Sequence, residues 1–274
     1  MLKQGCVTAI MFDGGGSSQG NFNGISITST RIVSNYILIW EDKTFKPTGV
    51  EGTTLVKKGS KGNNARWTQS MLQRIGYRIE VDGDFGTQSE SALKEFQTYW
   101  GLEIDKKCGP ATRTALKNCV NTIEYSSSKA LRIFTKELGR NEAKGQDDKY
   151  ILWYNAENGT KFATTVAWCA ISASWANSRG GIDKLKYPNF ASCSVSLKVF
   201  EKSGLVRNPK TYKPKSGDLI YFDWNQDGIA EHVGMVFSYD GKNVETIEGN
   251  SSDAVRHKKY IATSKYISKY VEVN

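Results

Sequence analysis

Three side chains that could form a catalytic centre lie in separate segments of the C-terminal half of the sequence: Cys169, His232 and Glu248. In that order they supply a nucleophile, a base and an orienting carboxylate, and the amide of Asn250 follows two residues further on. The sequence contains only two histidines, so the choice of base is nearly forced. This pattern predicts catalysis through a sulfur nucleophile.

The surroundings of Cys169 predict that it begins a helix. A thiol becomes a useful nucleophile when a helix N-terminus or a cationic neighbour lowers its pKa. Residues 170–178 have helical periodicity that ends at Gly180-Gly181, which places Cys169 at or within the first turn. In isolation, a buried structural cysteine would be the better interpretation of such a residue. Cys193 has no histidine-bearing element with which we can pair it.

The base and the acid are expected on strands. An apolar strand ends near Phe222, a polar loop follows over 223–231, and His232 opens the next strand beside a glycine, where a side chain projects easily into a cleft. A third strand, Asn243–Ile247, ends just before Glu248, whose carboxylate can accept the imidazole N–H and fix its tautomer. A helix-borne cysteine beside strand-borne histidine and acid is the papain-like constellation. His257 stands in a run of cationic residues and is expected to be solvated.

These motifs give residues 128–274 a resemblance to the CHAP domain, the cysteine- and histidine-dependent amidohydrolase/peptidase family of the NlpC/P60-like papain superfamily. The matching runs are GRNE at 139–142, AWCA at 167–170, SGDLI at 216–220, EHVG at 231–234 and EGN at 248–250. The resemblance implies that Cys169 is the nucleophile, His232 the base, Glu248 the orienting acid and Asn250 a fourth, polarising group. Whether Glu248 or Asn250 contacts the imidazole stays open.

Residues 54–118 carry a second recognisable pattern. The sequence has helical periodicity over 65–75 and 87–100 and predicts a third helix that begins at Pro110. Between these helices lie the turn VDGDFG at 81–86 and a similar turn, LEIDKKCG, at 102–109. We expect the aspartates of these turns to cap the following helices. The segment resembles the peptidoglycan-binding three-helix module, although Lys106-Lys107-Cys108 departs from the family's second turn. The resemblance implies that the peptidoglycan-binding residues are Asp82, Asp84, Phe85 and Gly86.

Together the two resemblances imply a phage endolysin or a related autolysin that binds bacterial peptidoglycan and hydrolyses one of its amide bonds. The muramoyl–L-alanine amide and a peptide bond of the stem or cross-bridge are both open. The alternative from another class is a non-catalytic wall-binding protein with an inactive papain-like domain. A cysteine protease acting on ordinary proteins is a third interpretation, which the wall-binding module disfavours.

The loop before His232 is the candidate metal site. Its oxygen-bearing residues Asp223, Asn225 and Asp227 occupy positions 1, 3 and 5, Gly228 position 6 and Glu231 position 9 of a calcium-loop pattern. Gly234 stands where an EF-hand requires a bidentate glutamate, so a solvated turn is the favoured interpretation. The catalysis requires no cofactor, and calcium is the one metal that the sequence suggests.

Residues 1–50 are expected to form short strands and turns. The DGGGSS turn at 13–18 and the RIVSN strand at 31–35 resemble the C-terminal piece of phosphodiester glycosidase domains. Since the resemblance covers only a small part of that fold, we interpret the segment as a remnant without glycosidase activity. It is too short to bury much surface alone.

The resemblances together imply an α+β protein: a short β-rich segment, a small three-helix bundle, and a papain-like domain with helices on an antiparallel sheet. The formal charge of +9 is spread along the chain, which suits a polyanionic wall better than nucleic-acid recognition. Five cysteines without metal spacing predict free thiols and synthesis in a reducing compartment. No signal peptide and no apolar run long enough for membrane insertion are seen, so we expect synthesis in the host cytoplasm and action on the wall after release. The sequence leaves the oligomeric state open.

Overall fold

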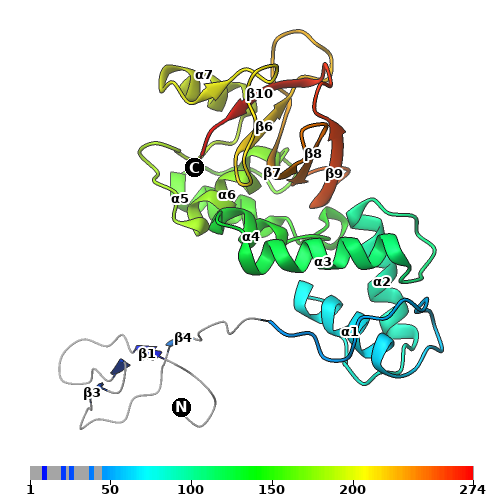
Figure 1. Cartoon of the computed structure of the whole chain (residues 1–274). Helices are drawn as coiled ribbons and strands as arrows, with labels where there is room; N and C mark the ends of the chain where they lie inside the picture. The colour runs from blue at the N-terminus through cyan, green and yellow to red at the C-terminus, as the bar shows by residue number, and fades with distance from the viewer. Residues whose placement is uncertain (1–7, 11–19, 23–24, 28–36, 40–44, 274) are drawn as a thin grey trace. The chain divides into compact units, whose positions relative to one another are not determined.

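The computed structural model describes residues 8–10, 20–22, 25–27, 37–39 and 45–273, and the chain divides into two compact units, Met1–Lys46 and Pro47–Asn274. The first unit contains an antiparallel sheet in the order β3-β2-β1-β4, with strands β1 (Thr8–Ile10), β2 (Gly20–Phe22), β3 (Ile25–Ile27) and β4 (Ile37–Ile39). The two runs on which the phosphodiester glycosidase resemblance rests lie outside the described residues. Figure 1 shows the elements of both units.

Three helices make up the segment with the wall-binding pattern: α1 (Asn63–Ile75), α2 (Thr87–Trp100) and α3 (Pro110–Tyr125). Two buried glutamines organise its repeated turns. Gln69 donates to the carboxylate of Asp82, and Gln97 donates in the same way to Asp105, both at 2.8 Å. Each glutamine oxygen also accepts a backbone N–H of its turn, from Gly83 or from Lys106. The departure at residues 106–108 therefore preserves the geometry of the turn.

One prediction about this region is wrong. The aspartates do not cap the helices, because the N-cap residues of α2 and α3 are Gly86 and Gly109, without side-chain cap bonds. Helix α3 continues to Tyr125, so little chain is left between it and the next helix, which Ser128 caps by accepting the N–H of Leu131.

The C-terminal part is a six-stranded antiparallel sheet with helices packed against it, which confirms the predicted α+β class (Figure 1). The sheet order is β5-β10-β6-β7-β8-β9. Helix α6 packs on β7, and α4 contacts both β7 and β8. The helices are α4 (Lys129–Thr135), the short 3-10 helix η2 (Glu142–Lys144), α5 (Asp148–Asn158), α6 (Cys169–Gly180) and α7 (Cys193–Lys202). The strands are β5 (Val206–Arg207), β6 (Leu219–Phe222), β7 (His232–Tyr239), β8 (Asn243–Glu248), β9 (Arg256–Ile261) and β10 (Ile267–Val271).

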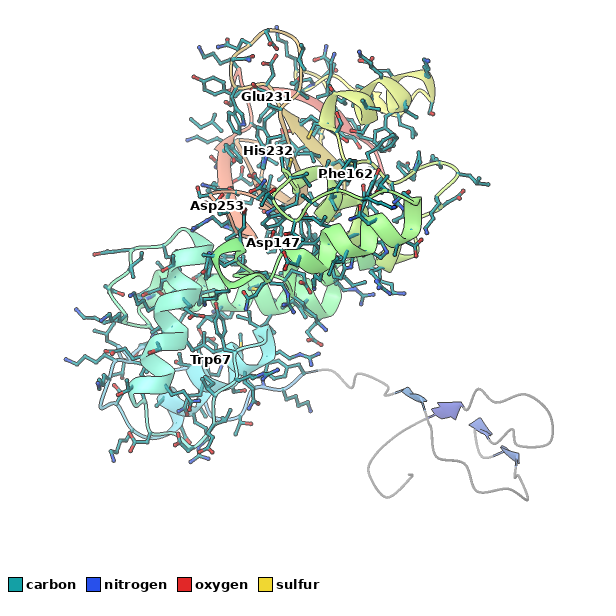
Figure 2. All side chains as sticks on the ribbon, turned by 180° about the vertical axis from the view of Figure 1, so that it is seen from behind. Trp67, Asp147, Phe162, Glu231, His232 and Asp253 are labelled. Atoms are coloured by element: carbon teal, nitrogen blue, oxygen red, sulfur yellow. The ribbon has the colours of Figure 1, made fainter. Side chains whose placement is uncertain are left out.

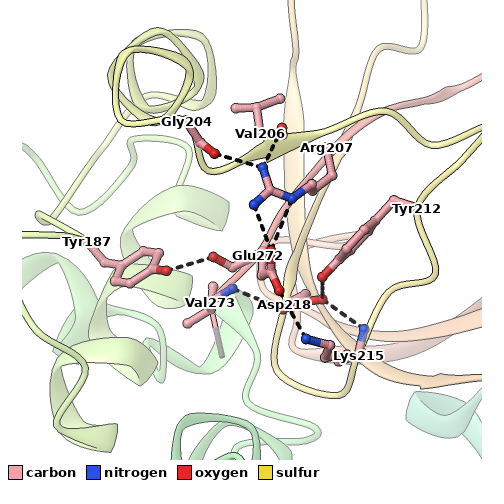
Figure 3. Close-up of polar contacts among 9 residues, drawn as sticks. All are labelled: Tyr187, Gly204, Val206, Arg207, Tyr212, Lys215, Asp218, Glu272 and Val273. Atoms are coloured by element: carbon pink, nitrogen blue, oxygen red, sulfur yellow. Dashed lines mark hydrogen bonds and ion pairs between the residues drawn. The ribbon is translucent and has the colours of Figure 1, made fainter.

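Buried Asp218 fixes the start of β6. Its carboxylate accepts the hydroxyl of Tyr212 and the backbone N–H of Lys215 on one oxygen, and the N–H of Val273 on the other (Figure 3). The carboxylate of Glu272 binds Arg207 and Lys215 beside it. This network joins the C-terminal strand to the turn before β6, so the sheet presents β7 in a defined position.

His257 is not solvated, contrary to the sequence-based prediction. Its side chain is buried, and its ring stacks on Trp100 of α2 with 4.1 Å between ring centroids. Its Nε2 lies 3.2 Å from the Glu245 carboxylate. His257 therefore ties the three-helix segment to the sheet and is unavailable as a base. Within the described residues, every helix is too short or too polar to cross a membrane.

Candidate active site

Cys169 is the first residue of α6, as the glycine-terminated periodicity predicted. The residue before it, Trp168, is the N-cap of α6. Its side chain is fully buried, and its indole N–H donates to Glu142 at 3.3 Å. Cys169 itself is 7% exposed. The N-terminal end of a helix dipole favours negative charge, so this position stabilises a thiolate at the edge of the domain's interior.

His232 is the first residue of β7 and faces both other members of the predicted set. Its Nε2 lies 3.0 Å from Oε2 of Glu248, and the imidazole also interacts with the Cys169 thiol. Since Nε2 is held by Glu248, Nδ1 is the nitrogen left to exchange a proton with sulfur. The structure thus brings together Cys169, His232 and Glu248 from α6, β7 and the end of β8.

Glu248, rather than Asn250, is the carboxylate or amide that contacts the imidazole. The Glu248 side chain is 1% exposed and accepts three hydrogen bonds, from His232, from Thr246 at 2.5 Å and from Tyr260 at 3.2 Å. Asn250, two residues after Glu248, has a left-handed backbone (φ 55°). Within the described residues, its side chain forms no hydrogen bond. The three donors hold Glu248 in the orientation that fixes the His232 tautomer.

Two glycines in the motifs allow these elements to approach. A methyl group at Gly234 would lie 2.6 Å from Cγ of Glu248, and one at Gly249 would lie 2.0 Å from Oγ of Ser172 on α6. Both distances are shorter than any ordinary contact. The glycines of the EHVG and EGN runs are therefore required by packing between β7, β8 and α6.

The interactions favour a thiolate–imidazolium pair. The pKa of Cys169 is lowered to about 4, mainly by a hydrogen bond from Cys193, with a further contribution from His232, and against the effect of burial. Burial disfavours the charged imidazole of His232, but the hydrogen bonds with Cys169 and Glu248 outweigh it and raise its pKa to about 10. With the pKa of Cys169 lowered and that of His232 raised, the proton resides on His232 near neutral pH.

Cys193 is the site residue that the sequence did not reveal. It is the first residue of α7, and its sulfur lies 3.7 Å from that of Cys169. Burial and the hydrogen bond to Cys169 raise its own pKa, so it stays a thiol and donates to its neighbour. A helix N-terminus at Cys193, capped by Ser192, was the available signal, but the position of α7 depends on the tertiary fold.

Aromatic side chains border the histidine on the side of the loop that precedes it. Trp224 is 40% exposed, stacks on Phe222 at 4.8 Å between ring centroids, and lies 6.4 Å from the His232 ring. Figure 2 shows His232 between the helices and the loop that carries Glu231. A substrate that reaches His232 from solvent would meet the exposed indole.

The predicted calcium set is not formed in this geometry. The loop carboxylates accept hydrogen bonds from the protein itself: Asp223 from the N–H of Gly228, and Glu231 from the N–H of Trp224 and the amide of Asn225. Asp227 accepts from the same amide. In the described part of the chain, no three His, Cys, Asp or Glu side chains are grouped to hold a metal ion. Calcium binding by this loop stays a prediction.

The predicted peptidoglycan-binding residues are divided between surface and core. Asp82 and Asp84 are exposed, and Asp84 forms an ion pair with Lys61 at 2.8 Å. Phe85 is fully buried, so its prediction as a contact residue is wrong: the ring belongs to the core between the helices. Gly86 begins α2 as its N-cap.

Comparisons with known proteins identify both parts of the second unit. The family described as "Putative peptidoglycan binding domain" matches residues 61–116, and the CHAP domain family matches residues 137–250. The N-acetylmuramoyl-L-alanine amidase CwlM of Mycobacterium tuberculosis is 34% identical over 92 residues, which are 33% of this chain and 22% of CwlM. The spore cortex-lytic enzyme of Bacillus cereus is 23% identical over 199 residues, 68% of this chain and 73% of that enzyme.

Among solved structures, the SleB N-terminal domain is 31% identical, covers 25% of this chain and 96% of its own, and has a TM-score of 0.25. The chain spans about a fifth of the length of CwlM. It contains a CHAP domain, with helices on an antiparallel sheet, and a helical peptidoglycan-binding domain.

Proposed function

We propose that the chain is a cysteine-dependent peptidoglycan hydrolase that cleaves an amide bond of the bacterial cell wall. The observation that carries this proposal is the convergence of Cys169, His232 and Glu248, with 3.0 Å between His232 and Glu248 and a thiol–imidazole interaction beside it. The peptidoglycan-binding domain before the CHAP domain supports peptidoglycan as the substrate.

The proposed reaction uses the charges already present in the site. The Cys169 thiolate attacks the carbonyl carbon of the amide, and a backbone N–H at the start of α6 donates to the oxyanion that develops. His232 then gives its proton to the leaving amine, whose departure produces a thioester on Cys169. His232 next takes a proton from water, and the resulting hydroxide attacks the thioester carbonyl. The C–S bond breaks, which releases the carboxylic acid and restores the Cys169 thiolate beside the His232 imidazolium.

Two bonds are open to this chemistry. An N-acetylmuramoyl-L-alanine amidase would cut the bond between muramic acid and the first residue of the stem, whereas an endopeptidase would cut within the stem or cross-bridge. CwlM and the cortex-lytic enzyme carry names of wall hydrolases, which favours the wall as target without choosing the bond. Mass spectrometry of the released fragments distinguishes the two, because only the amidase frees the amine of the first stem residue.

A lysis assay tests the activity itself. Purified Gram-positive walls incubated with the full chain should lose turbidity, and Cys169→Ala should reduce the rate by about 10³-fold or more, since it removes the nucleophile. The alternative, a wall-binding protein with an inactive papain-like domain, predicts sedimentation with the walls and no release of fragments. Equal rates for the wild type and the variant would refute the proposal.

We also propose that the protein is made in the host cytoplasm and acts on the wall after release through the membrane, as a phage endolysin does. The excess of positive charge supports attraction to an anionic wall. Gram-positive cells that express the chain should stay intact until the cytoplasmic membrane is permeabilised and should then lyse. Lysis before permeabilisation would contradict this order of events.

A further inference from the structure

The two sulfurs of the site form an uncommon pair. Cys169 and Cys193 are each the first residue of a helix, α6 and α7, and they are 7% and 6% exposed. Their Sγ atoms lie 3.7 Å apart, close to van der Waals contact, although neither forms a disulfide. A second thiol at that distance from a nucleophile can do covalent chemistry with it.

We propose that Cys193 is a resolving thiol for Cys169, so that a hydroperoxide converts the pair into an intramolecular disulfide that reversibly stops hydrolysis. The inference rests on the proposed function, since it takes Cys169 as the nucleophile of the wall hydrolase. The class of oxidant is a hydroperoxide, and the class of reductant that restores activity is a dithiol.

The chemistry is balanced in two steps. The Cys169 thiolate attacks one peroxide oxygen, the O–O bond breaks, and the product is a sulfenic acid and hydroxide, which takes a proton to become water. The Cys193 sulfur then attacks the sulfenic sulfur, the S–OH bond breaks, and the thiol proton leaves with the hydroxide as a second water. The two thiols supply two electrons, and one hydroperoxide consumes them.

The surroundings fix the backbone of Cys193 and leave the sulfur as the part that moves. The hydroxyl of Ser196 donates to the Cys193 carbonyl at 2.7 Å and is hydrogen-bonded to Tyr221 of β6 at 2.9 Å, which anchors the start of α7 to the sheet. A disulfide needs its sulfurs about 2.05 Å apart. Rotation of the two cysteine side chains about their χ1 bonds is the motion that closes the remaining gap.

The other described cysteines explain why oxidation should be selective. Cys108 and Cys119 are fully buried in the three-helix segment, and burial raises the pKa of Cys108 to about 11 and that of Cys119 further still. Because Cys108 and Cys119 are thiols rather than thiolates at neutral pH, they react slowly with peroxide. Cys169 is the thiolate of the set, and a neighbouring thiol protects it from irreversible over-oxidation.

Peptide mapping tests the proposal directly. The full chain is treated with a few equivalents of hydrogen peroxide, alkylated and digested with trypsin without reduction. We expect a cross-link between tryptic peptides 162–179 and 187–198 with a loss of about 2 Da. Lytic activity should fall at least tenfold and return after dithiothreitol. Absence of this cross-link while Cys169 is oxidised would overturn the proposal.

The matched variant is Cys193→Ser, which keeps a hydrogen-bond donor and removes the second sulfur. After peroxide it should lose activity permanently, because Cys169 proceeds to sulfinic acid that dithiothreitol does not reduce. Recovery equal to that of the wild type would also overturn the proposal. If the wild type forms the cross-link after peroxide but does not hydrolyse walls in its reduced state, the thiol pair stands and the proposed function fails. Failure of the thiol pair and failure of the proposed function are therefore distinguishable.

Discussion

Gly234 lacks a side chain at the point where Glu248 passes beside strand β7 to reach His232: a methyl group there would lie 2.6 Å from Cγ of Glu248. The glycine two residues after His232 therefore leaves the space that Glu248 needs to reach the imidazole. Its conformation is not the reason, since any residue could adopt it; the close approach of the neighbouring strand is.

Substitution Gly234→Ala should displace the Glu248 carboxylate and lower kcat/KM for wall hydrolysis by about tenfold or more. The matched control is Gly109→Ala, where the added methyl group would be 3.5 Å from Leu55, an ordinary contact, and activity should stay within about twofold. Lysis rates of folded variants, checked by circular dichroism, measure the effect. Wild-type activity in Gly234→Ala would contradict the role given to Glu248.

Replacement of Glu248 by glutamine should lower kcat/KM by about 10²-fold or more, because the amide keeps the shape but loses the charge that stabilises imidazolium. The high-pH limb of the rate profile should move to lower pH, since hydrogen bonding to Glu248 raises the pKa of His232. Asn250→Ala should cost less, because its side chain does not contact the imidazole. A larger loss in Asn250→Ala than in Glu248→Gln would reverse the assignment.

The pH dependence of kcat/KM should be a broad plateau. The reactive form needs Cys169 deprotonated and His232 protonated, so activity is lost as pH falls through the lowered pKa of Cys169, about 4, and as pH rises through the raised pKa of His232, about 10. Initial rates in buffers of constant ionic strength, on walls that have been shown to be stable, measure the profile. A single rise centred near the ordinary thiol pKa, about 8.5, would argue against the ion pair.

Chelation should leave activity within about twofold, since the loop before His232 is closed by its own hydrogen bonds, including Gly228 N–H to Asp223 and the bonds to Glu231. The measurement compares lysis after dialysis against EDTA with lysis after calcium is restored. A large loss on chelation that calcium reverses would re-establish the calcium set that the sequence suggested, and Asp223, with one buried carboxylate oxygen lacking a partner, would be its first candidate ligand.

Much of the site follows from local patterns. The helical periodicity after Cys169 and the double glycine that ends it predict the start of α6. The end of the polar loop before His232 predicts that this residue begins β7. What the sequence could not provide depends on tertiary packing. The 3.7 Å approach of Cys193 to Cys169 needs α7 to be placed against the sheet, and no periodicity encodes that contact.

The errors have the same origin. His257 lies in a cationic run, but the alternation of a strand turns it inward, where Trp100 covers it. Phe85 sits in a turn motif that suggests a ligand surface, yet the small domain uses the ring in its core. In both cases charge or motif pointed to the surface, and packing with a distant element determined the burial.

The most direct test of the account is capture of the covalent intermediate. The full chain is mixed with soluble peptidoglycan fragments, quenched in acid within milliseconds to seconds and digested, and the peptide spanning 162–179 is examined by mass spectrometry. We expect an acyl adduct on Cys169 that is absent in Cys169→Ala. Fragment release at the wild-type rate by Cys169→Ala, or an adduct on another residue, would contradict it.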